Sequence, residues 1–157
     1  MNHRCDQGKE RRGRCNLCST PLCGAACFQK HVAIGCGFYL PDLGERTVEN
    51  DAFLRVLMTT STQQLTVMYL SPGEDIGTEI HPKTTQSVRV EKGNGWASVD
   101  RGLYKLAEES WVTIPPGNEH NIWADKDGGG LWLYSIYSPP HHPAGAVYQL
   151  KTDMPTE

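Results

Sequence analysis

Short apolar or alternating stretches follow one another along the second part of the chain. The clearest are residues 65–70, 88–91, 111–114 and 131–137, and turn-forming residues lie between them at 72–73, 93–95, 115–117 and 127–130. Short strands at this spacing predict an antiparallel sandwich or barrel. Residues 49–58 fit either a helix or a strand, of which we favour the strand, and residues 37–47 predict a short connector.

Composition places the chain among folded proteins that do not enter a membrane. It has 157 residues, of which 38% are hydrophobic and 21% are charged. These values suit one domain with a small appendage and exclude a disordered composition. No apolar run approaches the roughly 20 residues of a membrane helix, so we expect no membrane association. The N-terminus lacks the apolar stretch of a secretory signal, which predicts an intracellular, reducing compartment, the cytoplasm or the nucleus.

Charge and cysteine content change abruptly near residue 37. Residues 1–37 hold six of the 15 Lys and Arg residues, two of the 18 Asp and Glu residues, and all six cysteines. The acidic excess therefore belongs to the residues that follow. We predict two units, a Cys/His zinc-binding module at 1–37 and an all-β domain at 38–157.

The cysteine spacing in residues 1–37 favours structural zinc over a disulfide framework. A Cys-x2-Cys pair in a tight turn can bind one tetrahedral ion, whereas disulfides need an oxidising compartment. A segment of this length buries too little surface to fold without metals or bridges, and a reduced, unfolded tail is the alternative. The candidate ligands of one or two zinc ions are His3, Cys5, Cys15, Cys18, Cys23, Cys27, His31 and Cys36.

Two arrangements of these ligands stay open. If residues 26–33 form a short helix, Cys27 and His31 lie one turn apart and suit a shared ion. If the ligand pairs interleave instead, two ions are bound, and this is the arrangement we favour. One zinc ion then has the ligands His3, Cys5, Cys23 and Cys27, and the other has Cys15, Cys18, His31 and Cys36.

The segment from Arg14 to Cys36 resembles the cross-brace zinc fingers that end piggyBac-type transposases, and it is similar to MYND and HIT fingers. The resemblance rests on Cys15-x2-Cys18 before Leu22-Cys23-x3-Cys27-Phe28, with His31 nearby. It implies a module that binds DNA or a protein partner. A basic run within residues 4–14 can contact phosphates, although a solvated loop between ligand pairs is the simpler interpretation. The run consists of Arg4, Lys9, Arg11, Arg12 and Arg14.

Four polar residues of the predicted β-domain form a candidate metal site. Glu79 and His81 are two residues apart, so their side chains share one face of a strand. Gln86 follows on the same stretch, and His120 comes directly after a turn that can aim it inward. Two imidazoles and a carboxylate with vacant positions suit iron, manganese, nickel or zinc. Spacing alone does not establish that the four side chains converge.

Residues 64–143 resemble a cupin, and this resemblance links the four positions. The first cupin motif corresponds to Glu79, His81, Gln86 and Gly93, and the second to Pro115, Gly117 and His120. Glu79 stands in place of a histidine of the motif and Gln86 in place of its glutamate. Parts of 64–93 and 137–143 are also similar to small single-domain cupins labelled mannose-6-phosphate isomerase-like. The resemblance implies a jelly-roll, or double-stranded β-helix, with the four side chains around a divalent metal ion.

Two functions from different classes are compatible with these residues. One is a metal-dependent isomerase or oxygenase acting on a small, sugar-like molecule, with Glu119 or His142 as candidate general base. A phosphate clamp for such a substrate would draw on Arg89 and Lys92, which strand alternation places on opposite faces. The alternative is a non-catalytic cupin scaffold whose zinc module binds a nucleic acid or a protein. Cupins commonly pair through strand edges, so a homodimer is expected.

Overall fold

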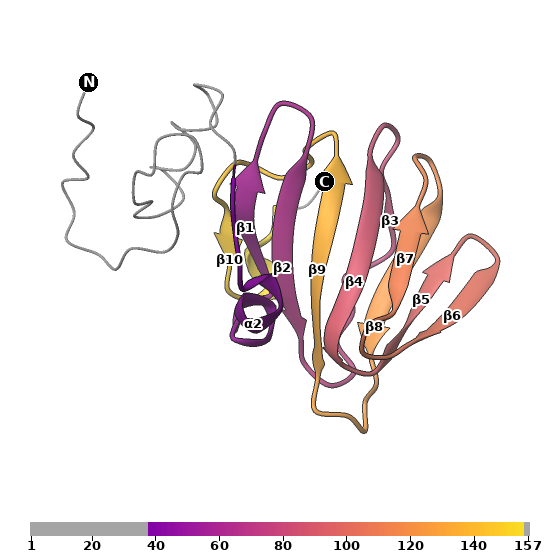
Figure 1. Cartoon of the computed structure of the whole chain (residues 1–157). Helices are drawn as coiled ribbons and strands as arrows, with labels where there is room; N and C mark the ends of the chain where they lie inside the picture. The colour runs from indigo at the N-terminus through magenta and orange to yellow at the C-terminus, as the bar shows by residue number, and fades with distance from the viewer. Residues whose placement is uncertain (1–37, 156–157) are drawn as a thin grey trace, which may run out of the picture.

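The computed structural model describes residues 38–155, which form two antiparallel sheets and two short helical segments (Figure 1). The predicted zinc module at 1–37, with all of its candidate ligands, lies outside the described residues. The helical segments are α2 (Leu43–Val48) and the 3-10 turn η1 (Lys151–Asp153). The strands are β1 (Leu54–Thr59), β2 (Gln64–Leu70), β3 (Glu79–Ile80), β4 (Thr85–Gly93), β5 (Gly95–Val99), β6 (Gly102–Leu106), β7 (Trp111–Ile114), β8 (Glu119–Ala124), β9 (Leu131–Ser138) and β10 (Val147–Tyr148).

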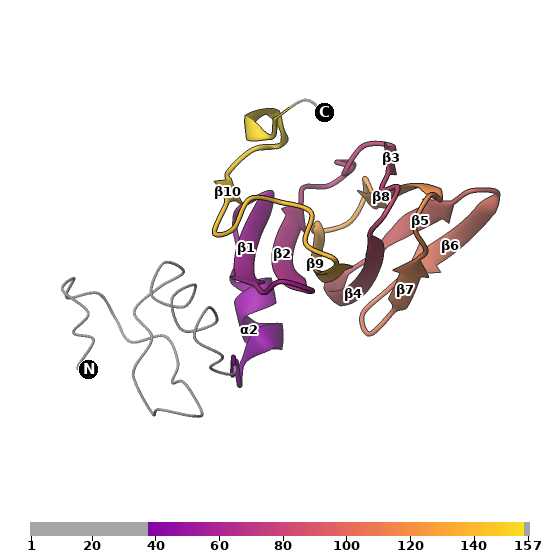
Figure 2. The same cartoon turned by 90° about the horizontal axis from the view of Figure 1, so that it is seen from above.

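Strands that are distant in sequence lie side by side in both sheets. The larger sheet has the order β10-β1-β2-β9-β4-β7 and the smaller one the order β3-β8-β5-β6. β9 fits between β2 and β4, and each neighbouring pair is antiparallel. Figure 2 shows β3 and β8 across the interior from β9 and β4. Two such sheets are consistent with the jelly-roll expected from the sequence.

Alternation along each strand decides which side chains enter the space between the sheets. In β9 the residues Leu131, Leu133, Ser135 and Tyr137 are buried, whereas the residues between them are only half buried. The hydrophobic core draws on both sheets, for example Leu133 from the larger and Ile122 from the smaller. The four stretches with the clearest strand pattern lie in β2, β4, β7 and β9, and β1 begins within the ambiguous stretch 49–58. The strand predictions are confirmed there. β9 has one buried face, whereas β2 is buried at all but one of its positions.

The predicted connector at 37–47 is wrong in part, because Leu43–Val48 form the helix α2. Six residues are too few to display a helical hydrophobic period, so the sequence carried little signal. Packing stabilises the helix, which lies against β2, β4 and β9. Thr47 is fully buried in this contact, and its hydroxyl donates to Leu43 O at 2.8 Å. Across residues 38–155, no helix is both long and apolar enough to span a membrane.

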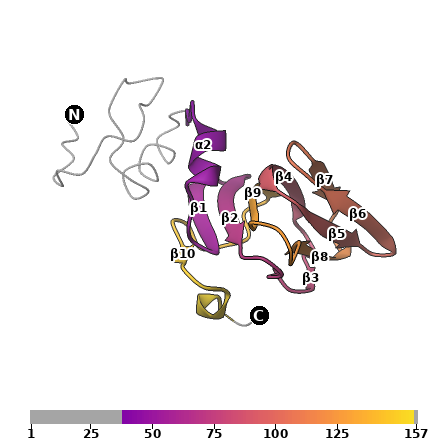
Figure 3. The same cartoon turned by 90° about the horizontal axis from the view of Figure 1, so that it is seen from below.

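After β9 the chain returns along β1 as a C-terminal strap, residues 146–155. β10 pairs with β1, and the Phe53 N–H donates to Gln149 O at 3.1 Å. Farther along, Lys151 Nζ donates to Asp75 Oδ1 in the connection between β2 and β3. Figure 3 shows η1 on the same side of the molecule as that connection. The strap thereby brings Met154 to the interior of the barrel.

Candidate metal centre

Three of the predicted ligands converge between the two sheets. β3 and β8 are neighbours, and their register places Glu79 directly opposite His120, while His81 follows β3 at once. The potential ligand atoms of the three side chains lie within 4.8 Å of one another. His81 Nε2 is 3.3 Å and His120 Nε2 is 3.9 Å from Glu79 Oε2. This cluster can hold a metal ion.

The imidazole of His81 is buried without hydrogen bonds. The residue is 3% exposed, and neither of its ring nitrogens makes a hydrogen bond. Its 3.3 Å approach to Glu79 is an ion-pair distance that lacks hydrogen-bond geometry. A buried donor or acceptor without a partner costs about 1–3 kcal/mol. A metal ion bound through Nε2 would satisfy that nitrogen, and two imidazoles with one carboxylate are a donor set that fits a divalent ion.

His120 presents its Nε2 to the same point. Its Nδ1–H donates a hydrogen bond to Asn118 O at 3.0 Å. Nε2 is therefore unprotonated, and its lone pair can accept a hydrogen bond or bind a metal ion. Burial lowers the pKa of His120 and outweighs the opposing effect of the Asn118 carbonyl, so the ring is neutral at neutral pH. Gln86 Oε1 lies 3.0 Å from His120 Nε2. Both atoms are acceptors and repel each other at this distance. A cation bound between them would remove the repulsion, and so would exchanging the positions of the oxygen and nitrogen of the Gln86 amide.

Hydrogen bonds behind Gln86 fix the position of its buried side chain. Gln86 Nε2 donates to Tyr137 Oη at 3.1 Å and to Ser135 Oγ at 3.4 Å. Burial raises the pKa of Tyr137, so its phenol stays protonated. The structure therefore brings Gln86 to the three ligands, as the sequence predicts. Sequence reasoning missed Ser135 and Tyr137, although alternation along β9 places both on the inner face.

Glu79, His81 and His120 are called the ligand group below. His142, one of the two candidate bases, lies on the wall of a cavity beside this group. Its Nε2 is buried without a hydrogen bond. Burial, reinforced by the charge of His141, lowers the pKa of His142 to about 4. The imidazole is therefore neutral near pH 7 and is a weaker base than an exposed histidine. The ring of His141 lies next to the ligand group, with its centroid 4.0 Å from that of His81.

Gln64 fixes the backbone that carries these two histidines. It is fully buried, and its Oε1 accepts from the backbone N–H groups of His141 and His142 at 3.2 and 2.8 Å. Its Nε2 donates to His142 O at 2.7 Å and to Thr59 Oγ1 at 2.9 Å. Sequence reasoning missed Gln64, for which the available signal was a polar residue at an inward position of β2.

The other candidate base, Glu119, lies away from the ligand group. It is exposed and precedes the buried His120 on β8, so alternation turns its side chain to the opposite face. The two predicted phosphate contacts are also outside the barrel. Arg89 pairs with Glu91 at 3.0 Å, and Lys92 lies over the ring of Trp132 at 4.9 Å from its centroid.

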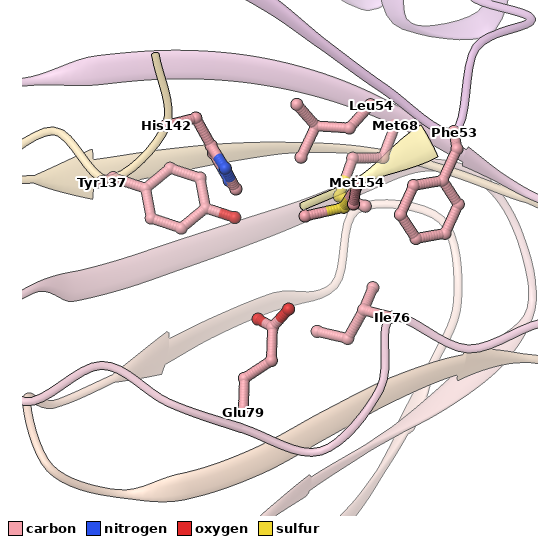
Figure 4. A pocket seen from close by; sticks show the side chains of 8 residues that line it. All are labelled: Phe53, Leu54, Met68, Ile76, Glu79, Tyr137, His142 and Met154. Carbon is pink, nitrogen blue, oxygen red and sulfur yellow. The ribbon is translucent and has the colours of Figure 1, made fainter. Parts of the chain in front are cut away.

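The cavity beside the ligand group has a volume of about 10 Å³, which is room for about one water molecule. Figure 4 shows the carboxylate of Glu79 and the hydroxyl of Tyr137 directed into it. Its lining consists of Phe53, Leu54, Met68, Ile76, Glu79, Tyr137, His142 and Met154. Among the described residues on this wall, none is a lysine or an arginine.

The sequence is similar to two proteins whose names record no activity. It is 36% identical over 121 residues to the uncharacterized protein YrkC of Bacillus subtilis, covering 73% of this chain and 64% of YrkC. It is 38% identical over 112 residues to the uncharacterized protein L612 of Acanthamoeba polyphaga mimivirus, covering 69% of this chain and 70% of L612. The chain thus spans less than two thirds of the length of YrkC. No family model matches the chain.

Solved structures share the fold. BH2720 from Bacillus halodurans is 35% identical with a TM-score of 0.72, covering 76% of this chain and 94% of BH2720. The cupin-2 domain Rru_A2000 from Rhodospirillum rubrum is 26% identical with a TM-score of 0.51, covering 59% of this chain and 64% of that one. A cupin 2 domain-containing protein from Halorhodospira halophila is 20% identical with a TM-score of 0.53, covering 62% and 70%, which is a likeness of fold alone.

Proposed function

The chain belongs to the cupin-2 barrel proteins, as a homologue of YrkC and BH2720, and from this premise we propose that Glu79, His81 and His120 bind a divalent metal ion. The observation that carries the proposal is the buried imidazole of His81, which has no hydrogen bond and lies within ligand distance of a carboxylate and a second imidazole. Gln86 Oε1, beside His120 Nε2, supplies a fourth donor. Iron, manganese, nickel and zinc are the ions that suit this set.

The reaction that fits the site is a metal-dependent isomerisation or oxygenation of a small molecule. When bound, the ion would polarise a carbonyl or hydroxyl oxygen of that molecule. His142 is the candidate proton acceptor, because its Nε2 has no hydrogen bond and lies on the same wall as Glu79. The protonated Tyr137 hydroxyl orients the substrate from the same end of the cavity. The barrel walls exclude water from the reacting groups.

Metal analysis of the full-length protein tests this proposal. We expect about one equivalent of iron, manganese, nickel or zinc to be lost in His81→Ala, because one of the two imidazole donors is removed. Glu119→Gln is the matched control, since Glu119 adjoins His120 in sequence but points to the opposite face. Any zinc held by residues 1–37 is common to all three proteins and cancels in the comparison. Equal metal content in His81→Ala and the unsubstituted protein, after each has been supplied with all four ions, would refute the barrel site.

The small size of the cavity favours a second candidate function. A space of about 10 Å³ admits no substrate larger than water without movement of its walls. The cupin would then be a scaffold, pairing as a homodimer, and residues 1–37 would bind a nucleic acid or a protein. Their six Lys and Arg residues support that role. Two results would support this function. One is that the metal analysis finds no ion in the barrel, and the other is that DNA binding by the full chain is lost when residues 1–37 are deleted.

A further inference from the structure

The cavity beside the ligand group has one polar end and one apolar end. Glu79, Tyr137 and His142 form the polar end, where Figure 4 shows the carboxylate and the hydroxyl directed into the space. The apolar end consists of Phe53, Leu54, Met68, Ile76 and Met154. Within the described residues, neither end includes a cationic side chain. These walls match a molecule that carries one metal-binding group and one aliphatic group.

Met154 differs from the other apolar wall residues in its burial, since the other four are all buried. Leu54 and Met68 lie in the paired strands β1 and β2 and are 1% and 3% exposed. Met154, by contrast, is only partly buried and lies near the end of the C-terminal strap. The turn before it, η1, has exposed residues at Thr152 and Asp153. Met154 is therefore the part of the wall that can move most readily when a ligand larger than water enters.

We propose that Met154 sets the length of the ligand that the barrel accepts, and that this ligand is a short aliphatic carboxylate, or a molecule of the same chemistry, rather than a phosphorylated sugar. The inference rests on the proposed metal site, which receives the carboxylate while the aliphatic end contacts Met154. Each further CH₂ group that becomes buried raises affinity by about three- to fourfold, until the chain reaches Met154.

A phosphorylated sugar fits these walls poorly for two reasons. If the sugar end binds the metal ion, the phosphate lies farther along the cavity, where no wall residue is a lysine or an arginine, since Arg89 and Lys92 lie outside the barrel. Its hydroxyl groups would meet side chains such as Phe53 and Met68, which offer no hydrogen bonds and would leave those hydroxyls unpaired.

The test uses the full-length protein loaded with Mn²⁺ and three probes, trifluoroacetate, ω-trifluorobutyrate and ω-trifluorohexanoate. Mn²⁺ broadens the fluorine NMR signal of a probe that binds close to it, so a titration reports both affinity and place. We expect the butyrate to bind about tenfold more tightly than the acetate, with no further gain for the hexanoate. In Met154→Ala the preference moves to the hexanoate by about tenfold. Leu150→Ala, an exposed position on the same strap, keeps the original order.

Two measurements separate the failure of this inference from the failure of the metal site. Binding of iron, manganese, nickel and zinc is measured first, and if none of the four binds more than in His81→Ala, both proposals are overturned. If Mn²⁺ binds but Met154→Ala leaves the length preference unchanged, or a fluorinated hexose phosphate binds more tightly than the carboxylates, the metal site stands and the role of Met154 is refuted. Met154→Leu, which nearly preserves volume, keeps the preference for the butyrate and shows that Met154→Ala acts through cavity length.

Discussion

Gln64 is fully buried, and its amide makes hydrogen bonds to both backbone N–H groups and one carbonyl of His141 and His142. Gln64→Leu removes the partner of all three backbone groups, so we expect the free energy of unfolding to fall by about 2–4 kcal/mol. Urea denaturation followed by tryptophan fluorescence measures this, because all four tryptophans lie after residue 37. The exposed neighbour Gln63 is the control, and Gln63→Leu changes stability by less than about 0.5 kcal/mol. An equal loss in both variants would contradict the role of Gln64.

Sequence reasoning reached the candidate ligands more readily than the residues that support them. Glu79 and His81 share a strand face by spacing, but strand register is a property of the folded sheets, so only the cupin resemblance linked them to His120. Alternation places Gln64 and Tyr137 at inward positions, but it does not show which groups they contact, and those contacts are what tie them to the site. The sequence does not separate Glu119 from His142 as candidate base, because the face on which Glu119 lies depends on where β8 begins.

The C-terminal strap is attached to the β2–β3 connection by a contact whose strength depends on pH. Asp75 accepts hydrogen bonds from Lys151 and from Asn121, and these hold the pKa of its carboxyl below the ordinary value of 3.8. A lowered folded-state pKa adds stability above the unfolded pKa, and that stability is lost as pH falls through the folded pKa. Because both partners are 39% exposed, we expect Lys151→Gln to cost only about 0.5 kcal/mol at pH 6.

The measurement is urea denaturation of the unsubstituted protein and Lys151→Gln at pH 6 and at successively lower pH. The difference between the two should shrink below the ordinary pKa of 3.8, as Asp75 becomes protonated in both. Lys126→Gln, at an exposed lysine elsewhere, is the control and shows no such trend. A difference that stays constant down to the lowest pH would show that Lys151 acts through its aliphatic stem and not through Asp75.

Elements with one buried face were predictable, and those defined by tertiary contact were not. β9 alternates along its whole length, so its pattern was visible in the sequence. α2 has six residues and owes its stability to contacts with β2, β4 and β9, which no local period records. β3 and β10 have two residues each. Each is a strand only because it pairs with a neighbour, β3 with β8 and β10 with β1. The C-terminal strap and its contribution to the cavity wall were therefore not predicted from the sequence.

At the scale of the whole molecule, the described residues form one hydrophobic core from a single continuous part of the chain. Its buried members run from Phe53 to Leu133, and they come from both sheets. The change in charge and cysteine content near residue 37 remains a predicted boundary, because residues 1–37 lie outside the described part of the chain. A domain with its own core folds independently of its neighbours. The predicted boundary therefore implies that residues 38–157 fold by themselves.

We expect a fragment of residues 38–157 to unfold cooperatively, with a free energy of unfolding within about 0.5 kcal/mol of that of the full chain, because the described core draws on no residue before Phe53. Tryptophan fluorescence reports the same domain in both proteins. The fragment should also keep the metal ion that His81→Ala removes, while any zinc bound to the cysteines is lost with residues 1–37. A fragment that fails to fold, or that loses more than about 2 kcal/mol, would mean that residues 1–37 pack against the barrel and that the chain is one cooperative unit.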